Sequence, residues 1–357
     1  MWLRVLFTLI FLINLQSQSV FDFEEISFAG SKVPLDKYDV KERIKKEYFK
    51  LLLDRKGYLL ELYDNYMFYE KMLLQAFDRE GLHHDYIYVA AVESGFDPRT
   101  VSSRGASGLW QFMKPTGQKY GLRIDEIIDE RNHPDLSTEA FIKHIKILLD
   151  KYNDSFKVLA AYNNGEFAFD QTLQNQKMND YWDCISNHET SEYVPKIVAM
   201  KLIFSEVEKN RLSTFADKTF DKYKNIEIVF NESLSFDDFC SMLNISYREF
   251  YQINSHLIHD SYRKGGRFLT NGNYNLYIPY DKVKLCQNIF SVNRFLEYEA
   301  SDTIFVKIEN ETIGELALIY GINWRELARQ NDLKIEKRKN GLEYVDLVKG
   351  QEIIIIR

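Results

Sequence analysis

Residues 86–111 read YIYVAAVESGFDPRTVSSRGASGLWQ and place one acidic residue, Glu93, at the end of an uncharged run. Gly95 and the Asp97-Pro98 pair then end the predicted helix, because glycine permits a turn and proline cannot continue helical hydrogen bonding. Burial at a helix end favours the protonated form of a carboxyl group, as a general acid requires near neutral pH. Carboxylates near helix ends are also common as structural residues, and this pattern alone leaves that alternative open.

The composition indicates a folded protein of several domains that does not bind nucleic acid. A chain of 357 residues with 45% hydrophobic content can bury a large core, and its length predicts two or three domains. The formal net charge of -7 argues against sequence-independent binding to nucleic-acid phosphates. The 23 Tyr, 25 Phe and 4 Trp can fill a core and can also stack on the apolar faces of sugar rings.

The cysteines and histidines show no metal-binding pattern. Cys184, Cys240 and Cys286 lack metal-type spacing, and an odd number leaves at least one thiol unpaired within the chain. We interpret them as small buried residues, with a Cys240–Cys286 disulfide as the alternative. The seven histidines form no H-E-x-x-H motif, so no metal site and no cofactor are expected.

The N-terminus has the pattern of an export signal. Arg4 precedes an apolar run at residues 5–15, about half of the ~20 residues that span a bilayer, and the polar sequence QSQS follows. The pattern predicts a signal peptide at residues 1–18 and an exported protein. An uncleaved N-terminal anchor is the alternative.

Most of the chain up to residue 215 has helical periodicity. Leucines and aromatic residues recur at helical spacing between residues 38 and 80, which predicts an N-terminal helical lead-in over residues 19–80. Residues 81–215 are predicted to form one mainly α domain. Its helices are expected at residues 86–93, 115–120, 135–152, 156–163 and 189–204.

The sequence pattern changes after about residue 222. A strand-like run at residues 226–230, two short helical segments and a second strand at 274–279 form a βααβ pattern. The pattern recurs with strands at 304–308 and 352–356 and helices at 312–320 and 323–330. Two small α+β repeats are therefore predicted, over residues 222–282 and 302–357.

Four motifs in residues 93–193 together resemble the soluble-type (SLT) family of lytic transglycosylases, and in particular its membrane-bound type D branch. Each motif alone is unspecific, whereas four in the same order over a hundred residues are very rarely found by chance. The motifs are Glu93-Ser94 with Pro98 and Ser102, GASGLWQ at 105–111, Ala161-Tyr162-Asn163, and Tyr193. The resemblance implies a lysozyme-like helical catalytic domain at 81–215 followed by LysM-type repeats.

The resemblance also implies a reaction. These enzymes cleave the β-1,4 bond between N-acetylmuramic acid (MurNAc) and N-acetylglucosamine (GlcNAc) in peptidoglycan without water, leaving a 1,6-anhydroMurNAc end. Ordinary glycosidases use two carboxylates, whereas here Glu93 is expected to act first as acid and then as base. The only other acids near the motifs, Asp97 and Glu166, are interpreted as a turn residue and a surface residue.

The remaining motif residues are expected to bind or orient the substrate and Glu93. Ser102 and Tyr193 are expected to orient the carboxyl group, and Gln111 and Asn163 to offer amides to the glycan. Tyr162 is expected to shape the wall of the site, while Gly105 and Gly108 are expected to let the backbone approach the sugar closely. The expected substrate-binding set is Ser102, Gly108, Gln111, Tyr162, Asn163 and Tyr193. Trp110 fits either stacking on sugar or core packing.

Binding of glycan is implied for the repeat at 302–357, whereas the repeat at 222–282 fits glycan binding and a structural role equally. The expected partner is the peptidoglycan glycan strand in the periplasm or cell envelope. Two other functions stay open: a lysozyme-like hydrolase that uses water, and a non-catalytic wall-binding protein. The set of polar residues at 93, 111, 163 and 193 argues against the second.

Overall fold

The computed structural model describes most of the chain between residues 23 and 295. It covers residues 23–206 except 55, then 212, and then 219–295 except 259–267 and 270–271. Beyond 295 it covers 304–307, 313, 324–331, 333–337, 343–345 and 352–355. The predicted signal peptide at residues 1–18 and most of the predicted helix at 312–320 lie outside the described residues.

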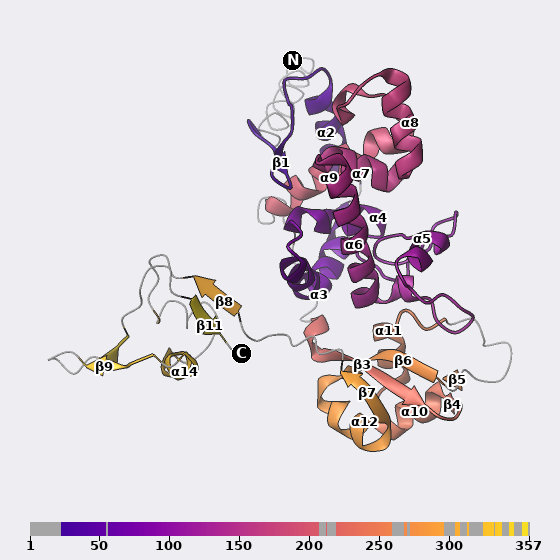
Figure 1. Cartoon of the computed structure of the whole chain (residues 1–357), viewed down its shortest axis with the longest axis vertical. Helices are drawn as coiled ribbons and strands as arrows, with labels where there is room; N and C mark the ends of the chain where they lie inside the picture. Colours follow the sequence, from indigo (N-terminus) through magenta and orange to yellow (C-terminus); the bar gives the residue numbers. More distant parts are fainter. Residues whose placement is uncertain are drawn as a thin grey trace, which may run out of the picture. The chain divides into compact units, whose positions relative to one another are not determined.

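The part of the chain up to residue 206 is predominantly helical, as predicted (Figure 1). A short hairpin of β1 (Ser27–Phe28) and β2 (Ser31–Lys32) precedes the helices. The main helices are α2 (Val40–Phe49), α3 (Lys56–Glu80), α4 (Ile87–Glu93), α5 (Lys114–Lys119), α6 (Pro134–Tyr152), α7 (Ser155–Asn164), α8 (Glu166–Gln176) and α9 (His188–Ser205).

Helix α9 lies at the centre of this helical part. It packs against α2, α4 and α7, while α6 packs against α7 and α3. Val194, Ile197, Val198 and Met200 of α9 are fully buried, because neighbouring helices cover several of its faces. This packing brings the end of α4 and the beginning of α9 close together although about 100 residues separate them.

The predicted helices are present, and α8 is an addition. Nothing in the sequence pattern predicted α8, because Phe169 is its one fully buried residue and polar side chains cover the rest. A helix without a clear apolar face gives no periodic signal. Gly165, with a φ of 80°, separates it from α7, where the predicted helix end was placed.

An aromatic stack supports the segment that follows α4. The Trp110 and Phe141 rings lie parallel with centroids 3.7 Å apart, and Phe77 stacks on Phe141 at 6.1 Å. Trp110 is completely buried, and its indole Nε1 donates to Thr138 Oγ1 at 3.0 Å. Of the two alternatives for Trp110, the structure shows core packing.

The predicted βααβ pattern after residue 222 is present and carries an extra helix and strand. The elements are β3 (Tyr223–Phe230), α10 (Phe236–Leu243), α11 (Tyr247–Ile253), β6 (Gly272–Pro279), α12 (Val283–Ile289) and β7 (Ser291–Phe295). The small strands β4 (Leu234–Ser235) and β5 (Phe268–Leu269) pair with each other. β3 lies between β6 and β7, so residues 291–295, which follow the predicted repeat, belong to the same sheet.

In the last part of the chain, β8 (Ile304–Lys307) pairs with β11 (Glu352–Ile355) in antiparallel register, from Glu352 opposite Lys307 to Ile355 opposite Ile304. Helix α14 (Trp324–Gln330) occupies the predicted second helix position. Strands β9 (Glu336–Lys337) and β10 (Glu343–Tyr344) also pair. The outer strands of the predicted repeat are thus paired.

Contacts within the chain define two compact units. One contains the residues up to Tyr223 together with Leu234–Leu269, and the other contains Lys224–Ser233 and Thr270–Arg357. Helices α10 and α11 therefore belong to the same unit as the helices around α9. A division of the chain at residue 222 does not follow the contacts.

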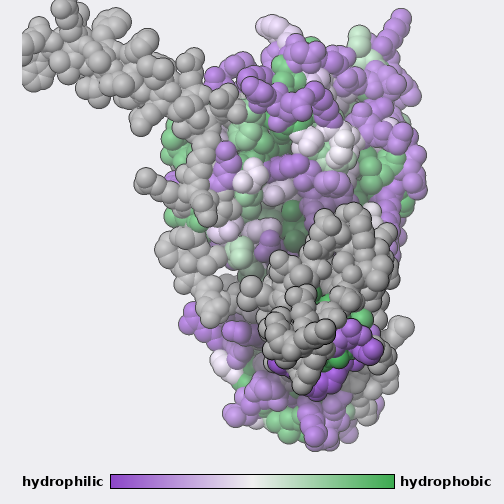
Figure 2. All heavy atoms as spheres, turned by 90° about the vertical axis from the view of Figure 1, so that its left-hand side faces the viewer, coloured by the Kyte–Doolittle hydropathy of each residue, from purple (hydrophilic) through white to green (hydrophobic). Residues whose placement is uncertain are grey.

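The cysteines are free and buried, as interpreted from the sequence, and the alternative Cys240–Cys286 disulfide is not formed. Hydrophilic side chains cover much of the face shown in Figure 2, with apolar patches between them, as on ordinary folded domains in water. Among the described residues, no helix has both the length and the apolar character needed to cross a membrane.

Candidate active site

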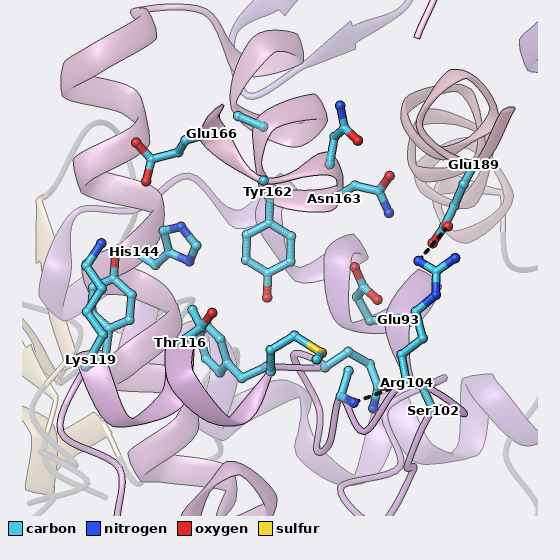
Figure 3. Close-up of a pocket in the computed structure, with 18 of the residues that line it drawn as sticks. Glu93, Ser102, Arg104, Thr116, Lys119, His144, Tyr162, Asn163, Glu166 and Glu189 are labelled. Atoms are coloured by element: carbon cyan, nitrogen blue, oxygen red, sulfur yellow. Dashed lines mark hydrogen bonds and ion pairs between the residues drawn. The ribbon is translucent and has the colours of Figure 1, made fainter. Parts of the chain in front are cut away.

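A pocket of about 670 Å³ opens beside the end of α4 (Figure 3). Its wall is formed by the segment that follows α4, by α5, by His144 of α6, by the end of α7 and by Glu189 at the start of α9. In Figure 3, Glu93 and His144 lie on opposite sides of Tyr162. Five predicted site residues line this pocket: Glu93, Ser102, Gln111, Tyr162 and Asn163.

Glu93 is half-buried at the last position of α4. The Tyr193 hydroxyl of α9 donates a hydrogen bond of 2.5 Å to Glu93 Oε1. Burial raises the pKa of Glu93 from its ordinary value of 4.5 to about 7, against the Tyr193 hydrogen bond and the charge of Lys196, which lower it. The carboxyl group can therefore both donate and accept a proton near neutral pH.

Tyr193 does not line the pocket, but its hydroxyl is hydrogen-bonded to Glu93. Burial and the negative charge of Glu93 raise the pKa of Tyr193 well above its ordinary value, so the hydroxyl keeps its proton. It donates to the carboxylate, which is the form that the hydrogen bond favours. This contact agrees with the predicted orienting role of Tyr193.

The turn after Glu93 fixes the position of the carboxyl group. Ser94 Oγ bonds to Ala90 O at 3.2 Å and to Leu109 O at 2.9 Å, which links the helix end to the segment opposite. Gly95 adopts a φ of 62°, in the left-handed region where glycine is unstrained. Asp97 Oδ1 accepts from the Arg99 amide at 2.9 Å, so Asp97 is the turn residue that the sequence predicted.

Residues 102–112, here named the pocket loop, supply one wall. Ser102 Oγ accepts from the Ala106 amide at 3.0 Å. The Gln111 side-chain NH₂ donates to Thr100 O at 2.8 Å and to Gly108 O at 2.9 Å, so this amide closes the loop on itself. What Gln111 still offers to a ligand is its carbonyl oxygen.

Two members of the predicted substrate-binding set, Tyr193 and Gly108, do not line the pocket. Gly108 packs on a neighbouring backbone instead. It has a φ of 87°, and a Cβ atom there would lie 1.8 Å from the Arg131 carbonyl oxygen. Glycine is required at this position because the loop packs on a neighbouring backbone. The predicted approach of the Gly108 backbone to the sugar stays a prediction.

The end of α7 supplies the opposite wall. The Tyr162 hydroxyl donates to Trp110 O at 2.5 Å, which ties α7 to the pocket loop. Thr190, a buried residue of α9, donates from Oγ1 to Asn163 Oδ1 at 2.7 Å. This bond fixes the orientation of the Asn163 amide and leaves its two N–H donors for a ligand.

The pocket contains charged residues that the sequence did not place there. Glu189 lines it and forms an ion pair with Arg104 at 3.5 Å, and its charge also raises the pKa of Glu93. Glu166, interpreted from the sequence as a surface residue, lines the pocket and pairs with Lys151 at 3.2 Å. Glu93 is thus not the sole pocket carboxylate. The sequence feature that could have indicated Glu189 as a pocket residue is its position four residues before Tyr193.

His144 completes the wall on the other side of Tyr162. Its ring stacks on Tyr120 with centroids 5.0 Å apart, and burial lowers its pKa to about 4. His144 is therefore neutral near pH 7. In the described parts of the chain, no group of three or more His, Cys, Asp or Glu side chains is arranged to hold a metal ion.

One segment of the sequence matches a known domain family. Residues 73–185 match the Transglycosylase SLT domain. The matched segment includes the pocket loop, α6 and α7, and it ends before Glu189, Thr190 and Tyr193 of α9. A residue that holds Glu93 thus lies outside the matched segment.

Two curated proteins show the extent of the similarity. The chain is 22% identical over 271 residues to "Membrane-bound lytic murein transglycosylase D" of Escherichia coli, covering 71% of this chain and 58% of that protein. It is 37% identical over 101 residues to "Peptidoglycan transglycosylase gp16" of Escherichia phage T7, covering 28% of this chain and 8% of that protein. The chain therefore spans less than two thirds of the length of either relative.

Among solved structures, the chain is similar to an inactive mutant of the lytic transglycosylase Slt from Pseudomonas aeruginosa. The identity is 22% and the TM-score is 0.32, over 42% of this chain and 26% of that one.

Proposed function

We propose that this chain is an exported peptidoglycan lytic transglycosylase that cleaves the MurNAc-β-1,4-GlcNAc bond without water and leaves 1,6-anhydroMurNAc ends. The observation that carries the proposal is Glu93, a half-buried pocket carboxyl with a pKa of about 7 and a hydrogen bond from Tyr193. The SLT domain match and the names of the two relatives support the same reaction class.

In the first step, Glu93 donates its proton to the glycosidic oxygen, and the bond from that oxygen to C1 of MurNAc breaks. The substrate's own acetamido oxygen stabilises the positive charge at C1. In the second step, the C6 hydroxyl of the same MurNAc attacks C1, and the Glu93 carboxylate takes the hydroxyl proton. The cycle returns Glu93 to its starting form, which a pKa near 7 allows at neutral pH.

The substrate-binding residues follow from the groups that the pocket presents. Asn163 offers two N–H donors, Gln111 a carbonyl oxygen and Ser102 a hydroxyl to the N-acetyl and hydroxyl groups of the glycan. The Tyr162 ring lines the pocket between these groups and His144. The pocket volume of about 670 Å³ lies within the range of sites that enclose a small ligand.

A lysozyme-like hydrolase is the second candidate, and Glu189 favours it. A second carboxylate in the same pocket is what a hydrolase needs to activate water. Against this role, the Glu189 side chain is 63% exposed and is paired with Arg104. Solvent and the Arg104 guanidinium both stabilise the negative charge of Glu189. Neither of them orients the Glu189 carboxylate as a base toward a water molecule.

The repeat at residues 302–357 is proposed to be a LysM domain that binds glycan. The pairing of β8 with β11 and the presence of α14 agree with the βααβ pattern from which it was inferred. Such a domain would hold the enzyme on the strand that it cuts. We place the protein in the periplasm or cell envelope, in line with the name of its membrane-bound relative and the export signal predicted from its sequence.

Incubation of the full-length protein with purified peptidoglycan sacculi tests the proposed function. Soluble muropeptides with anhydro ends are expected. Sacculi that stay insoluble while the protein binds to them would instead identify a non-catalytic wall-binding protein.

The pH dependence of kcat/KM should report the Glu93 carboxyl. Because the first step needs the protonated acid, kcat/KM is expected to fall as the pH rises through about 7. Tyr193→Phe removes a hydrogen bond that favours the charged form, so it should move this falling limb to higher pH. A limb at the same pH in wild type and Y193F would show that the titrating group is not Glu93.

Thr190→Val should weaken substrate binding through Asn163. The substitution keeps the shape but removes the donor to Asn163 Oδ1, so the amide is free to rotate and KM is expected to rise roughly tenfold. Steady-state kinetics on soluble glycan fragments measure the change. Thr190→Ser keeps the hydroxyl and is the matched control. An equal loss in both variants would assign the effect to packing.

A further inference from the structure

A second segment, residues 127–132, is hydrogen-bonded to the pocket loop. Arg131 is buried, and its NH1 group donates to Gly105 O at 2.7 Å and to Phe112 O at 2.9 Å. These two carbonyls lie near the two ends of the loop, so one guanidinium fixes both. Ser107 Oγ adds a bond of 2.6 Å to Asn132 Oδ1.

Arg131 itself has a fixed position. Its Nε and NH2 groups donate to the two carboxylate oxygens of Asp129 at 2.9 and 2.6 Å, in a pair that is about nine-tenths buried on both sides. Such a bidentate pair holds the guanidinium plane in one orientation. The Gly108 backbone packs on the Arg131 carbonyl, which leaves no space for the loop to move closer.

A third segment holds the second one. It consists of residues 254–258, which follow α11 in the predicted repeat at 222–282. His256 O accepts from the Asp129 amide and Ile127 O accepts from the Ile258 amide, each at 2.8 Å. Ser255 Oγ donates to Asn132 O at 2.6 Å.

Burial shows that this is a packed interface within one unit. Ile128 and Leu257 form a β-bridge and are 1% and 3% exposed. The His133 and His256 rings, both buried, lie with centroids 4.5 Å apart. Contacts group residues 234–269 with the helices around the pocket, so this interface belongs to a single compact unit.

A separate contact joins α11 to the turn that follows Glu93. The Arg99 guanidinium donates to Tyr251 O at 2.6 Å and to Gln252 O at 2.7 Å, and it lies 4.9 Å from the centre of the Tyr251 ring. Residues 94–100 in turn bond to the pocket loop through Ser94 and Leu109. The α11 region thus reaches the pocket loop from two directions.

We propose that residues 254–258 position the pocket loop for the reaction, with Arg131 and Ser255 as positioning residues, so that this half of the predicted first repeat is a working part of the catalytic unit. The kinetic part of this inference rests on the proposed function. A displacement of the loop by a fraction of an ångström would move Gln111 and Ser102 relative to Glu93, and such displacements lower kcat strongly.

The first test is a double-mutant cycle in the full-length chain. Ser255→Ala is expected to lower kcat about fivefold, and Arg131→Lys, which keeps the charge but loses the planar fork, about a hundredfold. If both act on the same loop, the double variant should lose clearly less than the product of the two factors. Losses that multiply would overturn the inference.

Ser246→Ala is the matched control. Ser246 caps α11 by accepting from the Glu249 amide, so its loss destabilises the same repeat without touching residues 127–132. Its kcat should equal that of wild type, and combined with Arg131→Lys it should give no coupling. A loss of kcat in S246A equal to that in S255A would show that general destabilisation, and not positioning, lowers the activity.

Hydrogen exchange of backbone amides gives a readout that does not depend on activity. The amides of Ser107, Gly108 and Gln111 are hydrogen-bonded within or beside the loop. Their exchange should accelerate in S255A and stay unchanged in S246A. Unchanged exchange in S255A would overturn the inference even for an active enzyme. Accelerated exchange in a protein that does not cleave peptidoglycan would support the positioning and refute the proposed function.

Discussion

Glu93→Gln should abolish release of muropeptides from sacculi, with kcat reduced about 10³-fold or more, because an amide can neither donate nor accept the transferred proton. The substitution keeps the shape of the side chain and changes nothing in the predicted LysM domain. Binding of the variant to sacculi, measured by co-sedimentation, should therefore match that of wild type. Turnover retained in E93Q would contradict the proposed mechanism.

The same variant should be more stable than wild type at alkaline pH. The folded-state pKa of Glu93 is raised to about 7 from 4.5, so the unfolded chain loses this proton first and wild-type stability falls as the pH rises between these values. After allowance for partial exposure, we expect E93Q to gain about 2 kcal/mol in unfolding free energy at pH 8 and nothing near pH 4. Denaturant unfolding at the two pH values measures this and shows that the inactive variant is folded.

Gly108→Ala should disrupt the pocket loop more than the same change at Gly105. The new Cβ would overlap the Arg131 carbonyl oxygen at 1.8 Å, and the φ of 87° is unfavourable for alanine. Overlap with backbone cannot be relieved by a rotamer change, so we expect a loss of about 4 kcal/mol in unfolding free energy together with most of the activity.

Gly105→Ala is the control for this prediction. Gly105 has a similar φ of 83°, but no atom lies within 4 Å of the position that its Cβ would take. The cost of the backbone conformation alone is about 1 kcal/mol. Thermal or denaturant unfolding of the two variants separates overlap from conformation. Equal destabilisation would show that the φ of Gly108 alone, and not its contact with Arg131, makes glycine necessary at this position.

Features encoded locally in the sequence were predicted well. The uncharged run that ends at Glu93, the turn at Gly95 and the end of α7 at Gly165 follow from residue type and spacing, and the structure has all three. The strands and helices of the βααβ patterns were likewise predicted where the structure describes them. In these segments, side-chain pattern and backbone preference indicate the same conformation.

Features that depend on tertiary packing could not be predicted. Glu189 enters the pocket because α9 packs on α4 and α7, and no periodicity in the sequence indicates that arrangement. The same holds for Thr190, whose bond to Asn163 joins residues 27 positions apart. Gly108 was predicted to let the backbone approach the sugar, whereas its contact with the Arg131 backbone is apparent only in the folded chain.

The boundary of the first repeat is the other feature that packing decides. The βααβ pattern at residues 222–282 predicted a separate module. Residues 254–258 instead bond to residues 127–132, and the contacts assign α10 and α11 to the unit that contains the pocket. A repeat pattern in sequence reports local structure and says nothing about which neighbour each half packs against.

The mass of the products from a sacculus digest tests the central claim most directly. After exhaustive digestion by the full-length protein, the proposed reaction predicts disaccharide-peptide fragments that end in 1,6-anhydroMurNAc, because the C6 hydroxyl of the substrate is the nucleophile. Each such fragment is lighter by one water molecule than its hydrolytic counterpart. Fragments with reducing MurNAc ends as the main product would contradict the account and would identify a hydrolase, with Glu189 as the first residue to test.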